Sequence, residues 1–175
     1  MATEDIDGRF AQGWGGRTPN GVHLNVLLAR RGSPTGAAVA TAFAHPSAGL
    51  TPVLASVGTD QQSYETLQPP TVIVNKVEAA DERHEKLLFG ACAAGISRGV
   101  LDVVADGTVR ADQDTLVLVS LWLDSAADDE TTVCANARTA AAAAVHEAAT
   151  GRDHEAVERL VRGRESVRHP FYDGD

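Results

Sequence analysis

Six histidines are the side chains of this chain best suited to acid–base chemistry at neutral pH. His23 differs from the others because it lies in a regularly alternating apolar stretch, Val22 to Arg30. His45 precedes Pro46 at a predicted helix end, where an interaction with the helix dipole explains it. Three more stand among Glu and Arg in predicted helices, and we expect them at the solvent-exposed surface: His84, His146 and His154.

The stretch around His23 predicts a strand with one face toward the core. Side chains alternate along a strand, so the core face is expected to hold Val22, Leu24, Val26 and Leu28. His23, Asn25, Leu27 and Ala29 then share the other face. The pattern alone favours a structural histidine over a catalytic one.

Lys76 is the second candidate, at the end of a predicted strand from Thr71 to Val77. Alternation places it on one face with Val72 and Val74. By pattern alone, a lysine near a strand end extends its ammonium group to solvent. No nucleophile motif accompanies either candidate.

Other chemistry is disfavoured by spacing. The chain has no His-x-x-x-His, Cys-x-x-Cys or Glu-x-x-His motif, so we expect no metal site. The glycines around Trp14 neither follow a predicted strand nor open a helix, and no Walker loop is present, so a nucleotide site is not indicated. Cys92 and Cys134 lie in predicted helices without paired spacing, which favours free thiols over a disulfide.

Composition predicts one globular domain. The chain has 175 residues, of which 43% are hydrophobic and 5% aromatic, so the core should consist of small side chains packed between helices and a sheet. A formal net charge of −9 disfavours nucleic-acid binding. The acidic start lacks a signal-peptide layout, and no apolar run approaches the ~20 residues of a membrane span. We therefore expect a cytoplasmic location and no membrane partner.

The remaining segments predict an α/β (α+β two-layer) fold. Residues 1–21 form a turn-rich arm, and Ser33 caps a helix that begins at Pro34 and ends near Ala44. The expected later elements are a strand 50–57, a polar loop 58–70, a long helix 79–105, a buried central strand 116–123, an Ala-rich helix from the acids 128–130 to about 149, and a charged helix 153–163. The apolar face of the long helix is predicted to contain Leu87, Leu88, Ala91, Ala94, Gly95, Leu101 and Val104.

Several short segments, in this order and with this spacing, resemble the formaldehyde-activating enzyme family. They are Val22-His23-Leu24-Asn25, Arg31-Gly32-Ser33-Pro34, Gly49-Leu50-Thr51-Pro52-Val53-Leu54-Ala55, Asn75-Lys76-Val77, Phe89-Gly90 and His169-Pro170-Phe171. The resemblance covers 22–171 and implies a single domain of that extent. It also implies a ribosomal-protein-S5-domain-2-like sheet with helices on one face, and a homopentamer.

The resemblance further implies an activity: formaldehyde condenses with the amine of tetrahydromethanopterin to give the methylene adduct and water. The pterin is a cosubstrate, no cofactor is bound covalently, no metal takes part, and the pterin cleft lies between neighbouring subunits. A histidine expels hydroxide from the carbinolamine as general acid, and His23 stands at its position. Lys76 and Leu54 stand where the family has a substrate-contacting lysine and a leucine that packs on the pterin.

Three implied contacts differ from the family pattern. Asn25 replaces an aspartate, Glu78 a threonine and Ala93 a glutamine. Asn25 lacks the charge that would favour a protonated histidine, and Ala93 lacks hydrogen-bonding groups. The sequence thus leaves open three hypotheses: formaldehyde activation with a tetrahydropterin, a diverged enzyme that condenses an aldehyde with another amine, and a non-catalytic pterin- or aldehyde-binding oligomer. The segment around Trp14 is expected to pack on a neighbour or to form a lid.

Overall fold

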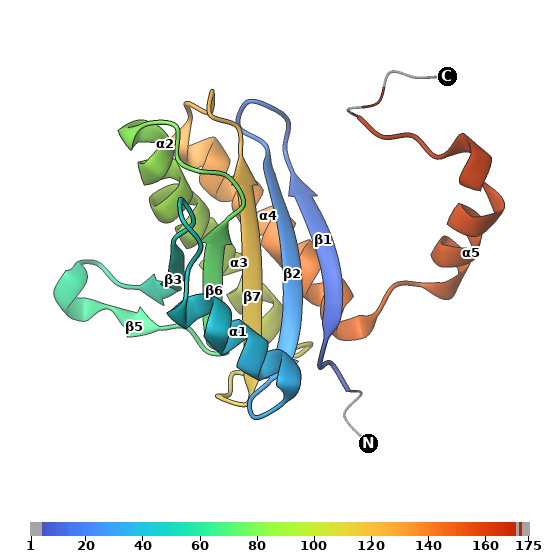
Figure 1. Cartoon of the computed structure of the whole chain (residues 1–175), viewed down its shortest axis with the longest axis horizontal. Helices are drawn as coiled ribbons and strands as arrows, with labels where there is room; N and C mark the ends of the chain where they lie inside the picture. Colours follow the sequence, from blue (N-terminus) through green and yellow to red (C-terminus); the bar gives the residue numbers. More distant parts are fainter. Residues whose placement is uncertain (1–4, 171, 173–175) are drawn as a thin grey trace.

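A computed structural model describes residues 5–170 and 172, and it contains a five-stranded sheet backed by helices (Figure 1). In spatial order the strands are β1 (Arg9–Gly15), β2 (Val22–Arg30), β7 (Thr115–Leu123), β6 (Thr71–Asn75) and β3 (Pro52–Leu54). β6 and β7 are parallel, and the other neighbours are antiparallel. The predicted α+β two-layer fold is confirmed, with β7 at the centre of the sheet.

Two long helical segments form the second layer, which packs on one face of the sheet. The first is continuous from Glu82 to Ala105 and comprises α2 (Glu82–Lys86), a π-helical turn (Leu87–Cys92) and α3 (Ala93–Ala105). The second is α4 (Glu130–Thr150), which Asp129 caps by accepting from the Thr132 amide. Contrary to the prediction of no membrane-length apolar run, the first segment is long and apolar enough to span a bilayer. More than half of its most apolar window is buried inside the protein, as in a core helix.

The predicted apolar face of the first segment is correct in part. Ala94 and Leu101 are exposed, whereas Gly95, Val100 and Val103 are buried. Leu87, Leu88, Ala91 and Gly95 are buried as predicted. Farther along the segment, Val100 and Val103 are buried in place of the predicted Leu101 and Val104.

Helix α1 (Pro34–Ala44) lies on the opposite face of the sheet, so the prediction of helices on one face is wrong (Figure 1). Its predicted start is confirmed: Ser33 is the N-cap and accepts from the Gly36 amide at 2.9 Å. Val39 of α1 packs in a small cluster with Ala29 and Val72. Because α1 is short, it covers one end of this face and leaves the His23 end open.

The predicted N-terminal arm, 1–21, contains strand β1, so it is not turn-rich at 9–15. β1 pairs with β2 along its whole length and forms one edge of the sheet. Gly13 and Gly15 face α4, where a Cβ atom would lie 2.1 Å from the Ala140 carbonyl oxygen and 2.0 Å from that of Asn136. The glycines that suggest turns in the sequence instead permit close helix–strand packing.

The segment predicted as one strand, 50–57, is divided into β3 and β4 (Ser56–Val57). β4 pairs with β5 (Glu65–Thr66) in a separate two-stranded sheet, with a 3-10 turn (Gln61–Ser63) between them. The predicted polar loop 58–70 thus contains a short strand. In Figure 1 this hairpin projects from the β3 edge of the sheet.

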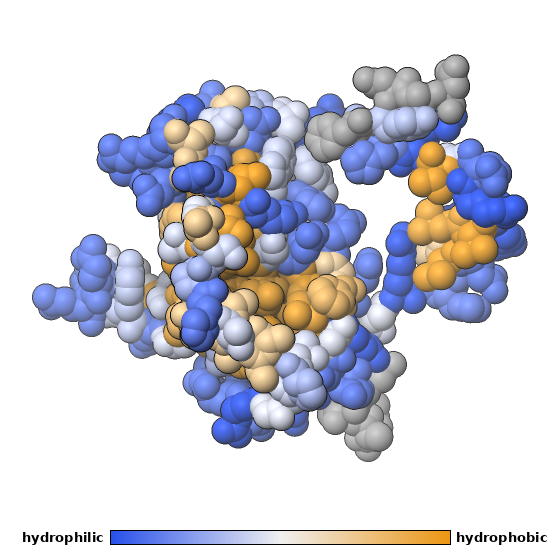
Figure 2. Space-filling view, in the orientation of Figure 1, coloured by the Kyte–Doolittle hydropathy of each residue, from blue (hydrophilic) through white to orange (hydrophobic). Residues whose placement is uncertain are grey.

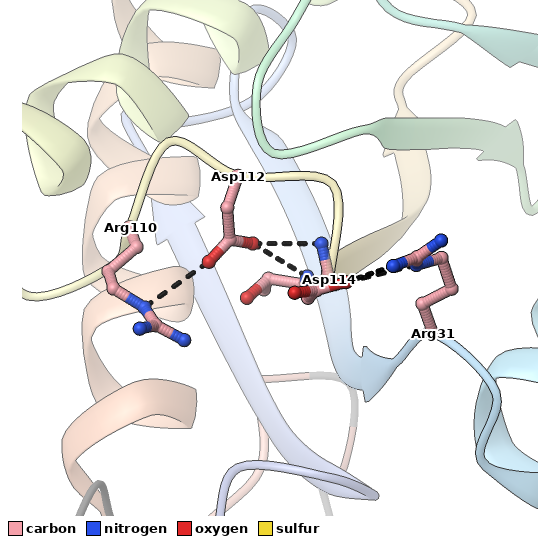
Figure 3. A network of polar contacts seen from close by, with 5 residues as sticks. Arg31, Arg110, Asp112 and Asp114 are labelled. Carbon is pink, nitrogen blue, oxygen red and sulfur yellow. Dashed lines mark hydrogen bonds and ion pairs between the residues drawn. The ribbon is translucent and has the colours of Figure 1, made fainter.

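A polar network fixes the start of β7 against the end of β2 (Figure 3). Asp112 accepts from the amides of Asp114 and Thr115 and pairs with Arg110 at 3.2 Å, while Asp114 accepts from Arg31 at 2.6 Å. These contacts connect β2 and β7 at the end of the sheet opposite His23. They help to set the β2–β7 register, which places Trp122 beside His23.

The C-terminal helix α5 (His154–Arg162) stands apart from the sheet and its helices, and a 3-10 turn (Arg164–Ser166) follows it (Figure 1). Its start is as predicted, with Asp153 as N-cap. Val157, Leu160 and Val161 are exposed on it, and Figure 2 shows an apolar patch on this helix. Of the family-like segment 169–171, Phe171 lies outside the described residues.

Candidate active site

His23 and Lys76 meet on the open face of the sheet. The Lys76 Nζ atom lies 2.8 Å from His23 Nδ1, although the residues are 53 positions apart in the chain. His23 is on β2, and Lys76 directly follows β6, where its backbone amide donates to the Leu121 carbonyl at 2.6 Å and extends the β6–β7 ladder. Buried Asn75 accepts from the Thr51 amide and donates to the Val77 carbonyl, so it fixes the chain on both sides of Lys76.

The second ring nitrogen of His23 contacts Gln12. Its Nε2 atom lies 3.1 Å from Gln12 Oε1. An amide oxygen only accepts, so Nε2 carries a proton and Nδ1 is free to accept from the Lys76 ammonium group. Both contacts fit a neutral imidazole in the Nε2–H tautomer.

Burial and charge act on both groups of this pair. Burial, and then the positive charge of Lys76, lower the pKa of the His23 imidazole below its ordinary value of 6.5. Burial also lowers the pKa of the Lys76 amine. Both shifts favour the neutral forms of the two side chains.

Two indole rings enclose this pair. In the β1–β2–β7 register, His23 lies between Trp14 and Trp122. The Trp14 ring centroid is 5.6 Å from that of His23 and 5.7 Å from that of Trp122. Trp14, His23, Lys76 and Trp122 line a hollow of about 240 Å³, and Trp14 also borders a neighbouring hollow with Arg17 and Pro170.

The remaining predicted site residues are not gathered in this hollow. Asn25 is exposed on the same face as His23, two positions along β2. Leu54 is also on this face, but it aligns across the sheet with Leu27, roughly 13 Å along the strands and roughly 14 Å across them from His23. Glu78 is exposed and lines a different pocket.

Ala93 lies in α3 and packs against the core on the other side of the sheet. Within one copy of the chain, it therefore does not reach His23. Ala93 and Leu54 share a site with His23 only if a second copy brings them there.

Sequence reasoning missed Gln12 and Trp122 as members of this site, and it considered Trp14 only as part of a segment that packs on a neighbour or forms a lid. Alternation along the strands could have indicated them. Gln12 and Trp14 share one face of β1, and Ser120 and Trp122 share one face of β7. The glycines beside Trp14 obscured the first strand, and the apolar run of β7 concealed which face Trp122 occupies.

His84 was predicted at the solvent-exposed surface, and this is wrong because its side chain is only 1% exposed. Its Nδ1 accepts from the Ala80 amide at 3.0 Å, and its Nε2 donates to the Leu123 carbonyl at 3.1 Å. Both ring nitrogens satisfy backbone groups, so His84 joins the start of α2 to the end of β7. The exposed positions of His146 and His154 are confirmed, and His45 ends α1 as its C-cap, as predicted.

Other parts of the described chain are weaker candidates for an active site. A larger hollow of about 710 Å³ lies between the ends of α3 and α4, where Asp102, Asp106 and His146 line it and the Thr150 hydroxyl donates to the His146 carbonyl. Among residues 5–170 and 172, no group of three or more His, Cys, Asp or Glu side chains is placed to hold a metal ion. Cys92 and Cys134 are free thiols, as predicted.

Comparison with known proteins identifies the family of this chain. The family model described as formaldehyde-activating enzyme matches residues 14–172. A 5,6,7,8-tetrahydromethanopterin hydro-lyase of Methanosarcina barkeri is 32% identical over 158 residues, which cover 89% of this chain and 85% of that protein.

Longer proteins match over part of the chain. A bifunctional enzyme Fae/Hps of Archaeoglobus fulgidus is 36% identical over 98 residues, 54% of this chain and 24% of that protein. The corresponding protein of Methanosphaerula palustris is 28% identical over 109 residues, 61% of this chain and 27% of its own length. The present chain thus aligns with about a quarter of each bifunctional enzyme.

Proposed function

Since this chain belongs to the formaldehyde-activating enzyme family, we propose that it condenses formaldehyde with the amine of a tetrahydromethanopterin-type tetrahydropterin. The products are the methylene adduct and water. The observation that carries the proposal is the 2.8 Å contact between His23 and Lys76, enclosed by Trp14 and Trp122. The pterin is a cosubstrate, and no metal or covalently bound cofactor takes part.

The slow part of this chemistry is the loss of a hydroxyl group. Attack of an amine on formaldehyde gives a carbinolamine, and its C–O bond breaks readily only if the oxygen is protonated as it leaves. In our proposal His23 gives that proton as general acid, and the nitrogen lone pair forms the C=N bond. Because the resting imidazole is neutral, the ammonium group of Lys76 supplies the proton that His23 then passes on.

The indoles suit the second substrate. A pterin is a flat heteroaromatic ring, and Trp14 and Trp122 offer apolar ring surface next to the proton donor. In this proposal the Trp14 segment forms a wall of the cleft.

We extend the proposal to a homo-oligomer, as a pentamer, in the cytoplasm. Leu54 and Ala93, the two site residues that one copy separates from His23, would be supplied by a neighbouring subunit. The exposed apolar side chains of α5 and Phe10, which is 74% exposed, support a further contact between copies. This arrangement makes the binding cleft an interface.

A second candidate function is condensation of an aldehyde with a different amine. It is favoured by Asn25, Glu78 and Ala93, which stand where the family pattern has aspartate, threonine and glutamine. Asn25 makes no hydrogen bond with His23 among the described contacts, and Gln12 contacts the Nε2 atom of His23 instead. The non-catalytic hypothesis is weaker, because a scaffold does not need two basic side chains desolvated against each other.

The test combines binding with catalysis. The chain has two tryptophans, both at this site, so its indole fluorescence reports on the cleft alone. Titration with tetrahydromethanopterin, corrected for absorption by the pterin, should quench the emission. Formation of the methylene adduct should then exceed the spontaneous rate.

The His23→Ala variant should lose the acceleration, while His45→Gln serves as its control, since His45 is exposed outside the site. An unchanged rate in His23→Ala would reject the role of His23. The Asn25→Asp/Glu78→Thr/Ala93→Gln triple variant tests the second candidate. If it binds pterin much more tightly than the native chain, the native amine partner is a different one.

A further inference from the structure

We propose that Lys76 captures formaldehyde covalently, as an iminium ion on its Nζ atom, before the carbon passes to the acceptor amine. The inference rests on the proposed function in taking formaldehyde as the substrate. It gives the first carbinolamine a location on the protein. His23 then acts on that carbinolamine at short range.

The surroundings of Lys76 suit a nucleophile better than a structural cation. Among the described residues no carboxylate pairs with Lys76, and its nearest polar partner is a basic ring nitrogen. The only other lysine of the chain, Lys86, has the usual arrangement: it is exposed and pairs with Glu82 at 3.1 Å. A half-buried lysine without a carboxylate partner is the form in which proteins use this side chain for Schiff-base chemistry.

The hollow has room for the reaction. Its volume of about 240 Å³ compares with about 30 Å³ for one water molecule in the liquid, so formaldehyde fits beside Nζ with space left for part of an acceptor ring. The walls are largely indole, which limits competing hydration of the aldehyde. The lowered pKa of the Lys76 amine agrees with this geometry, because it raises the fraction of unprotonated nucleophile.

The protons balance within the pair. The ammonium group of Lys76 gives one proton to Nδ1 of His23, and the Nζ lone pair then attacks the formaldehyde carbon while the C=O π bond opens. A proton passes from nitrogen to oxygen to give the neutral carbinolamine. The imidazolium Nδ1–H protonates the hydroxyl, water leaves with the C–O electron pair, and the Nζ lone pair forms the C=N bond. Ammonium plus formaldehyde has become iminium plus water.

Transfer to the acceptor follows the same atoms. The acceptor amine adds to the iminium carbon and loses a proton to Nδ1, which gives an aminal. Protonation of Nζ by the imidazolium breaks the bond from Nζ to carbon, and the acceptor nitrogen forms the new C=N bond. Lys76 is released as the neutral amine, and His23 returns to its neutral form.

Reductive trapping tests this directly on the native protein. Brief exposure to formaldehyde and cyanoborohydride converts an iminium into a methylamine, and peptide mass spectrometry then compares Lys76 with Lys86 in the same sample. Lys76 should be methylated faster than Lys86, because its lowered pKa raises the fraction of unprotonated amine. Equal methylation of the two lysines would overturn the inference.

Two variants separate capture from simple burial. His23→Gln should slow the trapping of Lys76 and leave Lys86 unchanged, whereas a lysine that is merely desolvated would keep its rate. Lys76→Arg keeps the positive charge and lacks a nucleophile, so it should abolish condensation, and Lys86→Arg should not. Full condensation by Lys76→Arg would reject capture and leave the proposed function standing. Selective trapping at Lys76 without any condensation of pterin would support capture and reject the proposed function.

Discussion

Two glycines of the first long helical segment should respond in opposite directions to the same substitution. A Cβ atom on Gly95 would lie 2.2 Å from the Cys134 carbonyl oxygen and 2.7 Å from the Ala137 Cβ atom, both in α4. Ordinary contact begins near 3.4 Å, so α4 must retreat by about 1 Å. The nearest atom belongs to helix backbone and has no freedom to rotate away.

The magnitude follows from two opposing effects. Overpacking of this kind costs about 1–3 kcal/mol, and alanine gains about 1 kcal/mol over glycine as a helix former. Because the clash is with helix backbone, the overpacking cost should lie in the upper part of that range, about 2–3 kcal/mol, so Gly95→Ala should lower the free energy of unfolding by roughly 1–2 kcal/mol. In a domain of this size each kcal/mol corresponds to about 2–4 °C in melting temperature.

Gly90→Ala is the matched control, because a Cβ atom added at Gly90 would have nothing within 4 Å of it. It should keep the gain in helix propensity and raise the melting temperature by a few degrees at most. Calorimetry at one protein concentration measures both variants. If Gly95→Ala melts at or above the native temperature, the close approach of α3 to α4 is wrong.

Three further predictions concern single side chains. By NMR, the His23 imidazole should titrate below 6.5, and Lys76→Met should raise its pKa because the repelling charge is lost while burial remains; a native value above 6.5 would contradict the network. His84→Leu should destabilise the fold by about 2–4 kcal/mol in urea denaturation, because two buried backbone groups lose their partners; an unchanged midpoint would show that these bonds are not needed. Burial raises the pKa of the Cys92 thiol to about 12, so iodoacetamide at mildly alkaline pH should alkylate Cys134 first. Faster alkylation of Cys92 in the native state would refute its burial.

The sequence by itself determined the elements that depend on local spacing. Strict alternation specified β2 from Val22 to Arg30 and assigned His23 and Asn25 to its non-core face. Ser33 marked the start of α1, because a capping side chain acts within three residues of itself, and the acidic residues 128–130 marked the start of α4, because negative charge is favoured at a helix N-terminus. The order and spacing of the short motifs also indicated the family, because both are properties of the linear chain.

Only the tertiary structure decided which of these residues meet. The contact between His23 and Lys76, and the enclosure by Trp14 and Trp122, depend on the register of four strands, and register is a long-range property. The burial of His84 depends on the end of β7, which lies 39 residues away along the chain. His23 thus began as one histidine on an open strand face, and the fold made it half of a desolvated pair with Lys76.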